Sequence, residues 1–214
     1  MTSQHGTIPF EQKSVHSVNW GLYWERYGVI AAFFAILILA SVVTPNFLSI
    51  SNILNVLTTM SFVLFVTNGQ TLVILSGGMD LSHGSLVSLS CMASAALLSI
   101  GHPWLGLLAG LAVGAVCGLT NGVIIGIIRL NPIVTTLGML YMAGGLALYF
   151  TGGKSIVGVA VGNAHGFHFL AEGTLFHIPF VLILAVFFLF LTHFVLRYTR
   201  FGNYIYALGG NEDA

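Results

Sequence analysis

The residues with the greatest chemical potential lie in one glycine-rich segment. This segment reads SGGMDLSHG at residues 76–84, and long apolar runs flank it on both sides. Asp80 is the only acidic residue between Arg26 and Arg129. Paired glycines favour the interruption of a helix, and a carboxylate close to hydrocarbon is costly enough that a function or a specific partner is expected for it. The sequence therefore predicts a broken-helix element near Gly77 to Gly84, with Asp80 acting locally.

Amide and hydroxyl side chains accompany Asp80 within the apolar runs. Asn68 and Gln70 precede the segment, and Ser82 lies inside it. Asn121 lies in a later apolar run. Because such groups suit a neutral polyhydroxyl solute, we assign these five residues to a translocation pathway or a polar core. The alternatives are that Asp80 or Ser82 is an N-cap, worth about 0.5–2 kcal/mol, and that the amides form interhelical hydrogen bonds.

The composition excludes a soluble protein. Hydrophobic residues make up 57% of the chain and charged residues 6%, whereas soluble domains carry about 25% charged residues. Six basic and six acidic residues give a net charge of zero, so no basic surface is expected to hold nucleic acid. Cys91 and Cys117 predict neither a disulfide nor a metal site. His165, His168 and His177 lack acidic or cysteine partners at ligand spacing, so we expect no metal and no cofactor.

Six apolar stretches are candidates for membrane spans, each of which needs about 20 residues. They cover residues 27–43, 53–75, 85–100, 104–128, 132–151 and 178–196, and the third is the shortest. A cytoplasmic N-terminus leaves five of the six basic residues inside and only Lys154 outside. The sequence thus predicts an all-α, polytopic transmembrane bundle of about six spans. Residues 1–26 would be a cytoplasmic tail, 27–196 the transmembrane domain and 197–214 a cytoplasmic segment.

The fourth stretch carries a glycine at every fourth position. The row comprises Gly106, Gly110, Gly114, Gly118, Gly122 and Gly126. Glycine lets the backbones of neighbouring helices approach closely, so the row predicts helix packing along the whole stretch. Four residues turn a helix by about 400°, and the row therefore drifts by about 40° at each step. Since one straight partner cannot contact the whole row, we expect a central helix crossed by at least two neighbours.

Several motifs occur in an order that is typical of one transporter family. The longer ones are GGMDLSHG at 77–84 and FGNYIYALGGN at 201–211, and shorter ones are NFLS at 46–49, NG at 121–122 and TTLG at 135–138. Together they resemble the ABC-type permeases that import ribose, xylose, arabinose and galactose. Met79, His83 and Asn203 depart from the usual residues of these motifs. The resemblance implies a membrane-spanning permease subunit of an ATP-driven importer, C-terminally truncated here, that forms the pathway for a monosaccharide by alternating access.

The same resemblance implies partners and a location. A cytoplasmic ATP-binding subunit, a periplasmic sugar-binding protein and a second permease copy, as a homodimer, would assemble in the lipid bilayer of a bacterial inner membrane. Gly209, Gly210 and Asn211 would lie at the entrance to the loop that couples the permease to the ATPase. ATP hydrolysis would belong to the partner, so the chain itself is expected to catalyse no bond chemistry.

Other function classes are alternatives to this interpretation. An ion-coupled secondary transporter would use Asp80 as a proton or cation site between broken helices. A purely structural membrane subunit would explain the glycine row but not the polar residues. An intramembrane protease is disfavoured, because Ile74 stands where a GxSG nucleophile motif would need glycine and no second intramembrane aspartate is present.

Overall fold

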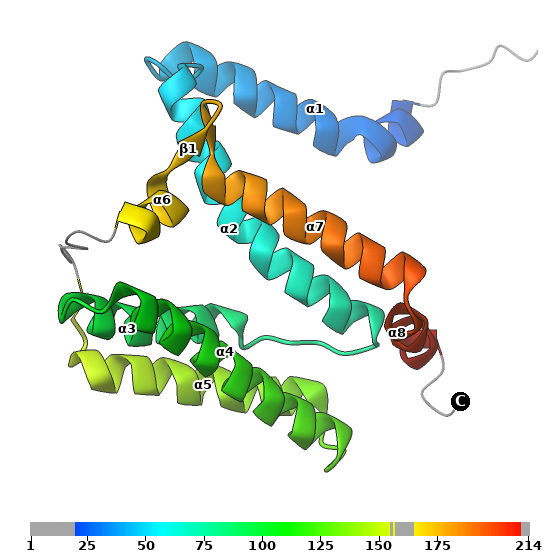
Figure 1. The fold of residues 1–214 in the computed structure, drawn as a ribbon. Helices are drawn as coiled ribbons and strands as arrows, with labels where there is room; N and C mark the ends of the chain where they lie inside the picture. The colour runs from blue at the N-terminus through cyan, green and yellow to red at the C-terminus, as the bar shows by residue number, and fades with distance from the viewer. Residues whose placement is uncertain (1–19, 155, 157–164, 211–214) are drawn as a thin grey trace, which may run out of the picture. The chain divides into compact units, whose positions relative to one another are not determined.

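The computed structural model describes residues 20–154, 156 and 165–210 and confirms the all-α class. Most of the chain is helical, and the described residues add one short antiparallel hairpin in which Thr174 pairs with Pro179 (Figure 1). The elements, in chain order, are α1 (Trp20–Val43), α2 (Ile50–Leu75), α3 (His83–Ser99), α4 (Pro103–Gly126), α5 (Pro132–Thr151), α6 (His165–Glu172), β1 (Thr174–Leu175), β2 (Ile178–Pro179), α7 (Phe180–Tyr198) and α8 (Arg200–Gly210).

The chain divides into two compact units, residues 1–52 and 53–214. The first unit contains α1 and the first turn of α2. Along α1, large apolar side chains such as Phe33 and Ile36 are more than half exposed, at 59% and 67%. A soluble protein would bury such a helix, whereas a bilayer solvates it, so this exposure is what a membrane helix requires.

The predicted spans correspond to helices, and the third one is short as expected. Among the described residues, α2, α4, α5 and α7 are long and apolar enough to cross a membrane. The apolar part of α1, over residues 27–43, and the 17-residue α3 are shorter. The sixth span begins later than predicted, because Ile178 and Pro179 form β2 and the helix starts at Phe180. The first helix begins at Trp20, seven residues before the predicted span and inside the predicted tail, and the other boundaries are within three residues of the predicted ones.

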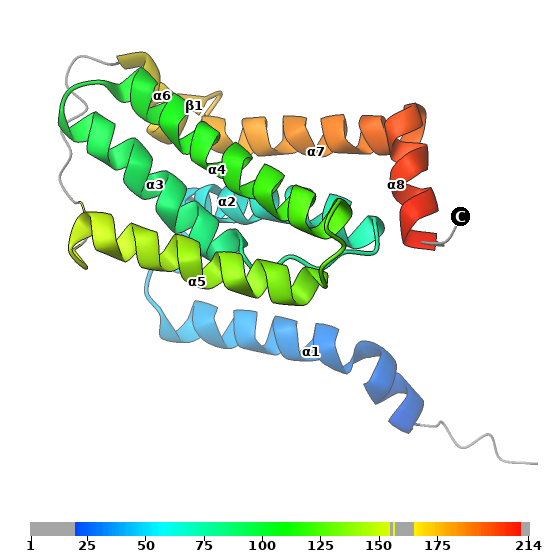
Figure 2. The same ribbon diagram turned by 90° about the horizontal axis from the view of Figure 1, so that it is seen from below.

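Three helices of the second unit, α3, α4 and α5, pack side by side (Figure 2). The helices α3 and α4 run antiparallel, since Gly106 faces Leu98 and Gly114 faces Ser90. A small core cluster of Leu89, Ala143 and Ala147 lies between α3 and α5. Small residues dominate this core because backbone packing replaces bulky side chains where hydrocarbon already solvates the outside.

The first turn of α5 shows how local sequence fixes a helix start. Pro132 occupies the first helical position, and the Asn131 side chain accepts a hydrogen bond of 2.9 Å from the backbone N–H of Ile133. Proline loses nothing there, because the N–H at that position has no helical partner. The helix ends at Gly152, whose φ of +61° is a left-handed conformation that glycine adopts without strain.

The last two helices, α7 and α8, are joined through Thr199, an extended residue. The Thr199 hydroxyl donates to the Val195 carbonyl at 2.6 Å and accepts from the Gly202 amide at 3.3 Å. A side chain at Gly202 would collide with the backbone of Leu196, so the sharp turn needs glycine there. The helix α8 was not among the elements predicted from the sequence. The signal that indicates it is the spacing of Phe201, Tyr204, Ile205 and Leu208, which marks one face of an amphipathic helix.

Candidate functional site

The segment between α2 and α3 is non-helical, as the paired glycines predicted. The chain turns at the end of α2, where Gly77 donates to the Ile74 carbonyl at 3.0 Å and Gly78 donates to the Val73 carbonyl at 2.9 Å. Gly77 has a φ of +81°, which strains any residue with a side chain. From Gly78 the backbone continues without regular structure until α3 starts at His83. Broken helices of this kind bring backbone groups and polar side chains to membrane depth.

The centre of the segment is a chain of hydrogen bonds among Asp80, Ser82 and Asn121. One carboxylate oxygen of Asp80, Oδ1, accepts from the Ser82 backbone N–H at 2.7 Å and from its hydroxyl at 2.6 Å. Asn121 Nδ2 on α4 donates to Ser82 Oγ at 3.2 Å. Ser82 is fully buried and Asn121 is 5% exposed. The structure therefore brings together three of the five polar residues that the sequence assigned to a pathway or core.

The N-cap interpretation of this segment is not what the geometry shows. Ser82 occupies the N-cap position of α3 but makes no side-chain cap hydrogen bond. Its single hydroxyl proton goes to Asp80, and the Asp80 carboxylate binds the Ser82 amide rather than an amide of the first helical turn. The carboxylate thus fixes the approach to α3, and Ser82 in turn receives the amide of Asn121.

Two buried amide atoms have no hydrogen-bond partner among the described residues. They are Oδ1 of Asn121 and Nδ2 of Asn68, and Asn68 is 9% exposed. A buried polar atom without a partner costs about 1–3 kcal/mol, so each of these atoms is expected to meet a further group in the working protein. Asn68 and the half-buried Gln70 lie on α2, and no hydrogen bond joins either of them to the Asp80 network in the described residues.

Two further residues border the Asp80 network. Thr136 of α5 is 1% exposed, and its hydroxyl lies 2.8 Å from the Pro132 carbonyl and 3.5 Å from the Met79 carbonyl. His83 Nδ1 lies 4.0 Å from Asp80 Oδ1. In the sequence, Thr136 stood out only as part of a motif, because its place beside residue 79 depends on the packing of α5 against the segment. Asp80 thus lies between elements contributed by α3, α4 and α5, with 22% of its side chain exposed.

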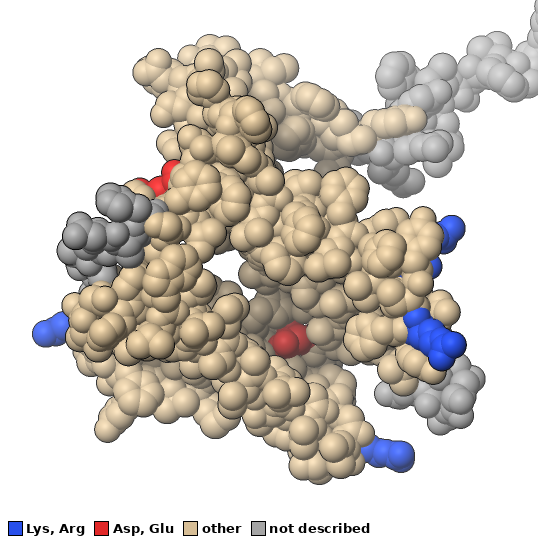
Figure 3. Space-filling model, in the orientation of Figure 1, with Lys and Arg blue, Asp and Glu red and all other residues tan. Residues whose placement is uncertain are grey.

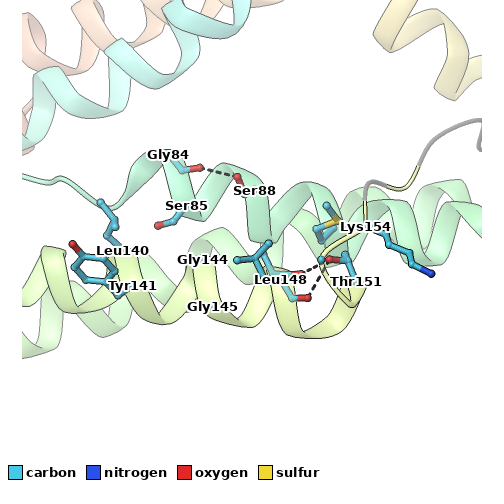
Figure 4. Close-up of a pocket in the computed structure, with 13 residues that line it drawn as sticks. Gly84, Ser85, Ser88, Leu140, Tyr141, Gly144, Gly145, Leu148, Thr151 and Lys154 are labelled. Atoms are coloured by element: carbon cyan, nitrogen blue, oxygen red, sulfur yellow. Dashed lines mark hydrogen bonds between the residues drawn. The ribbon is translucent and has the colours of Figure 1, made fainter.

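A groove of about 730 Å³ runs between α3 and α5 (Figure 4). It has hydroxyl groups from Ser85, Ser88 and Thr151, and Lys154 lies at one end. All three hydroxyls donate to carbonyls of their own chain segment, at 2.8, 3.2 and 3.0 Å. Their protons are therefore already used, and most of the remaining lining is apolar. The Tyr141 phenol and the Lys154 ammonium group also line the groove, so it keeps polar donors besides these three hydroxyls.

The glycine row of α4 is used unequally. A side chain at Gly106 would collide with Leu98 and the Ser94 carbonyl, and one at Gly110 would collide with the Ser94 side chain. Gly114 lies at ordinary contact distance from Ser90. The other three face open space among the described residues, namely Gly118, Gly122 and Gly126.

The three residues expected to couple to an ATPase are placed differently. Gly209 is in contact with the last residue of α2, because a side chain there would fall on the Leu75 carbonyl oxygen. Gly210 has no atom of the described residues within 4 Å of the position of a side chain. Asn211 lies outside the described residues. Gly209 is thus exposed but in contact with the end of α2, while the side-chain direction of Gly210 is open among the described residues.

No group of three or more potential metal ligands gathers in the part of the chain that the structure describes. His168 lies 3.4 Å from Glu172 one helical turn away on α6, and both side chains are more than half exposed. Lys and Arg side chains lie at the margin of a face that otherwise shows few charges (Figure 3). A surface so poor in charge fits a protein embedded in hydrocarbon.

Comparison with known proteins identifies relatives for most of the chain. Residues 52–214 match the family described as branched-chain amino acid transport system / permease component. The chain is 35% identical over 187 residues to the ribose import permease protein of Escherichia coli K12, covering 86% of this chain and 58% of the relative. It is 34% identical to the ribose import permease protein of Bacillus subtilis, with 95% and 62% covered.

A third relative is named for the transport of a different sugar. The D-allose transport system permease protein of Escherichia coli K12 is 31% identical, over 92% of this chain and 60% of the relative. The chain thus spans about 60% of the length of these curated relatives. No solved structure matches the chain.

Proposed function

We propose, from the premise that this chain belongs to the permease family of branched-chain amino acid transport systems, that it forms the membrane pathway of an ATP-driven sugar importer. The observation that carries the proposal is its similarity to ribose and allose permeases across 86% to 95% of the chain. The solute would be a monosaccharide. The chain would work in a bacterial inner membrane, with its N-terminus in the cytoplasm and its basic residues mostly on that side.

An ATP-driven importer needs further subunits, and these are the proposed partners of the chain. A cytoplasmic ATP-binding subunit would supply the energy, a periplasmic sugar-binding protein would deliver the solute, and a second permease copy would complete the pathway as a homodimer. The chain would need no cofactor and would make or break no covalent bond. It would serve as the element that opens alternately to either side while its partner binds and hydrolyses ATP.

The Asp80 network is the best candidate for a polar contact in this pathway. Asp80 Oδ1 is held by two hydrogen bonds from Ser82, which keeps the carboxylate at a fixed position beside α4. Among the described residues, Asn121 Oδ1 is a buried acceptor without a partner and Asn68 Nδ2 is a buried donor without one. Sugar hydroxyls both donate and accept, so a passing monosaccharide can satisfy either atom. Gln70 lies two residues after Asn68 on α2, so its amide points to another face of that helix and would meet the solute only from there.

Co-purification with candidate ATP-binding subunits tests this proposal. The full-length gene product in detergent should capture one ATP-binding subunit, and reconstituted vesicles should take up ribose or a related sugar only when that subunit can hydrolyse ATP. Capture of no ATP-binding subunit by the full-length protein would reject the importer.

An uncoupler separates the importer from the ion-coupled alternative. Uptake that persists at constant ATP with an uncoupler and a sodium ionophore rejects a proton or cation site at Asp80, because such a site needs an ion gradient. Uptake that follows the gradient and survives ATP depletion would move the ion-coupled transporter to first place. The Asp80→Asn variant adds a second readout. It keeps an oxygen for the two Ser82 hydrogen bonds, so an importer retains part of its uptake whereas an ion-coupled carrier loses its coupling group.

A further inference from the structure

The end of α8 touches the end of α2 backbone to backbone. A β-carbon added at Gly209 would fall on the carbonyl group of Leu75. It would lie 3.0 Å from the Leu75 carbonyl carbon and 3.3 Å from the Gly77 amide nitrogen. A side chain at Gly77 would in turn lie 3.5 Å from the Gly209 α-carbon. Glycine is present on both sides of the contact, so no side chain separates the two backbones.

The part of the chain that Gly209 touches leads directly into the Asp80 network. Gly77 and Gly78 are tied to the last turn of α2 by hydrogen bonds to Ile74 and Val73. Asp80 follows two residues after Gly78. Because these two hydrogen bonds hold Gly77 and Gly78 against the last turn of α2, a displacement of Leu75 or Gly77 that keeps the bonds carries the start of the following segment with it.

We infer that Gly209 is a positioning residue that passes movements of α8 to the Leu75–Gly77 turn and hence to Asp80, Ser82 and Asn121. This inference rests on the proposed function, because the movement of α8 is the one that an ATP-binding subunit would impose. The inference gives different roles to the two neighbouring glycines at the coupling position. Gly209 acts through its contact with the end of α2, and Gly210, which meets no described atom in its side-chain direction, is left to face a partner.

The contact is specific because an added methyl group has no room. The obstruction at Gly209 is backbone of α2 rather than the movable end of a side chain, so alanine can be accommodated only if α8 and α2 move apart. Gly69 provides a matched control on α2, since its side-chain direction meets no described atom within 4 Å and Gly69 itself is not among the proposed pathway residues.

The test uses the full-length permease with its ATP-binding subunit in vesicles. We expect Gly209→Ala to capture the ATP-binding subunit within about twofold of wild type and to hydrolyse ATP within about twofold. The sugar taken up per ATP hydrolysed should fall by at least about tenfold. Gly69→Ala should leave this ratio unchanged. A merely structural role would lower hydrolysis and uptake together, so the ratio is the readout that decides.

Two results with these variants would overturn the inference. One is an unchanged ratio in Gly209→Ala. The other is the loss of capture of the ATP-binding subunit, which would show that Gly209 faces the partner. A wild-type protein that shows neither capture nor ATP-dependent uptake is a different outcome, because it rejects the proposed function itself.

Hydrogen exchange on the wild-type complex tests the same link if Gly209→Ala does not fold. Binding of a non-hydrolysable ATP analogue should change amide exchange over residues 200–210 and, with it, over residues 76–82. The first half of α4, residues 103–114, serves as the internal reference and should change by less than either segment. A response over residues 200–210 without one over 76–82 would overturn the inference.

Discussion

The two halves of α4 use the same glycine repeat in different ways. In the first half, Gly106 and Gly110 lie so close to α3 that a methyl group would collide with Ser94. In the second half, Gly122 faces open space in the described residues, and Asn121 joins the network of Asp80. One periodic motif thus provides a packed helix pair at one end of α4 and a polar contact with exposed glycines at the other. The difference teaches that glycine spacing alone does not say which glycines pack.

The largest change in stability is expected when a methyl group is added to the packed first half of α4, and this substitution is the strongest test of the comparison. Gly110→Ala should lower the free energy of unfolding by about 1–3 kcal/mol, the usual cost of overpacking. Its methyl group would collide with the Ser94 hydroxyl and approach the Ser90 carbonyl to 3.1 Å. The intrinsic preference for alanine over glycine in a helix, about 0.5–1 kcal/mol, offsets part of this cost. Denaturant or thermal unfolding of the purified protein in detergent measures the effect.

A second substitution identifies the cause of that loss. Because the nearest atom to the new methyl group is the Ser94 hydroxyl oxygen, adding Ser94→Ala should recover part of the stability. Full additivity of the two single variants would show that Gly110 does not pack on Ser94, and the packed half of the comparison would then be wrong.

The polar contact of the second half predicts a smaller change in stability. Asn121→Ala removes one interhelical hydrogen bond, which is worth about 0.6 kcal/mol on average and at most about 1.7 kcal/mol in membrane helices. Sugar uptake should fall more than stability, since the substitution also removes the unpartnered acceptor that we place in the pathway. Unfolding and uptake are measured on the same preparation.

Thr120→Ala is the matched control for Asn121→Ala. The Thr120 hydroxyl donates to the Val116 carbonyl at 2.7 Å within its own helix, so its removal breaks no contact between helices. Equal effects of the two variants on uptake would place Asn121 outside the pathway and leave it as a helix-packing residue.

The sequence predicted more of the fold than of the site. The apolar stretches, the break after Leu75 and the start at Pro132 follow from length, glycine pairs and proline, which act locally, and each has a counterpart in the structure. The contact between Asn121 and Ser82 spans 39 residues and depends on the antiparallel packing of α3 and α4. No local rule sets that distance, so the sequence could group these residues only by chemistry.

The contact of Gly209 with Leu75 was beyond sequence reasoning for the same physical reason. It joins the end of α8 to the end of α2, and α8 itself was not predicted. Gly209 and Gly210 are equivalent in the sequence, and only the contact of Gly209 with the backbone of α2 distinguishes them. The orientation of the membrane and the assignment of partners stay predictions, because positive charges and motif similarity indicate them without any contact in the structure.

The smallest change in stability is expected for a substitution in the second half of α4, where the glycines face open space. Gly122→Ala should raise the free energy of unfolding of the chain by no more than about 0.5–1 kcal/mol, the intrinsic helix preference of alanine, because the methyl group meets no described atom within 4 Å. Gly110→Ala, on the same helix and three turns earlier, provides the contrast. If Gly122→Ala instead destabilises the full-length protein as much as Gly110→Ala does, then a further helix or a second copy covers this half of α4. In that case the glycine row packs along its whole length, as its spacing predicted. The contrast between the two halves of α4 would then hold only for contacts within the described part of the chain.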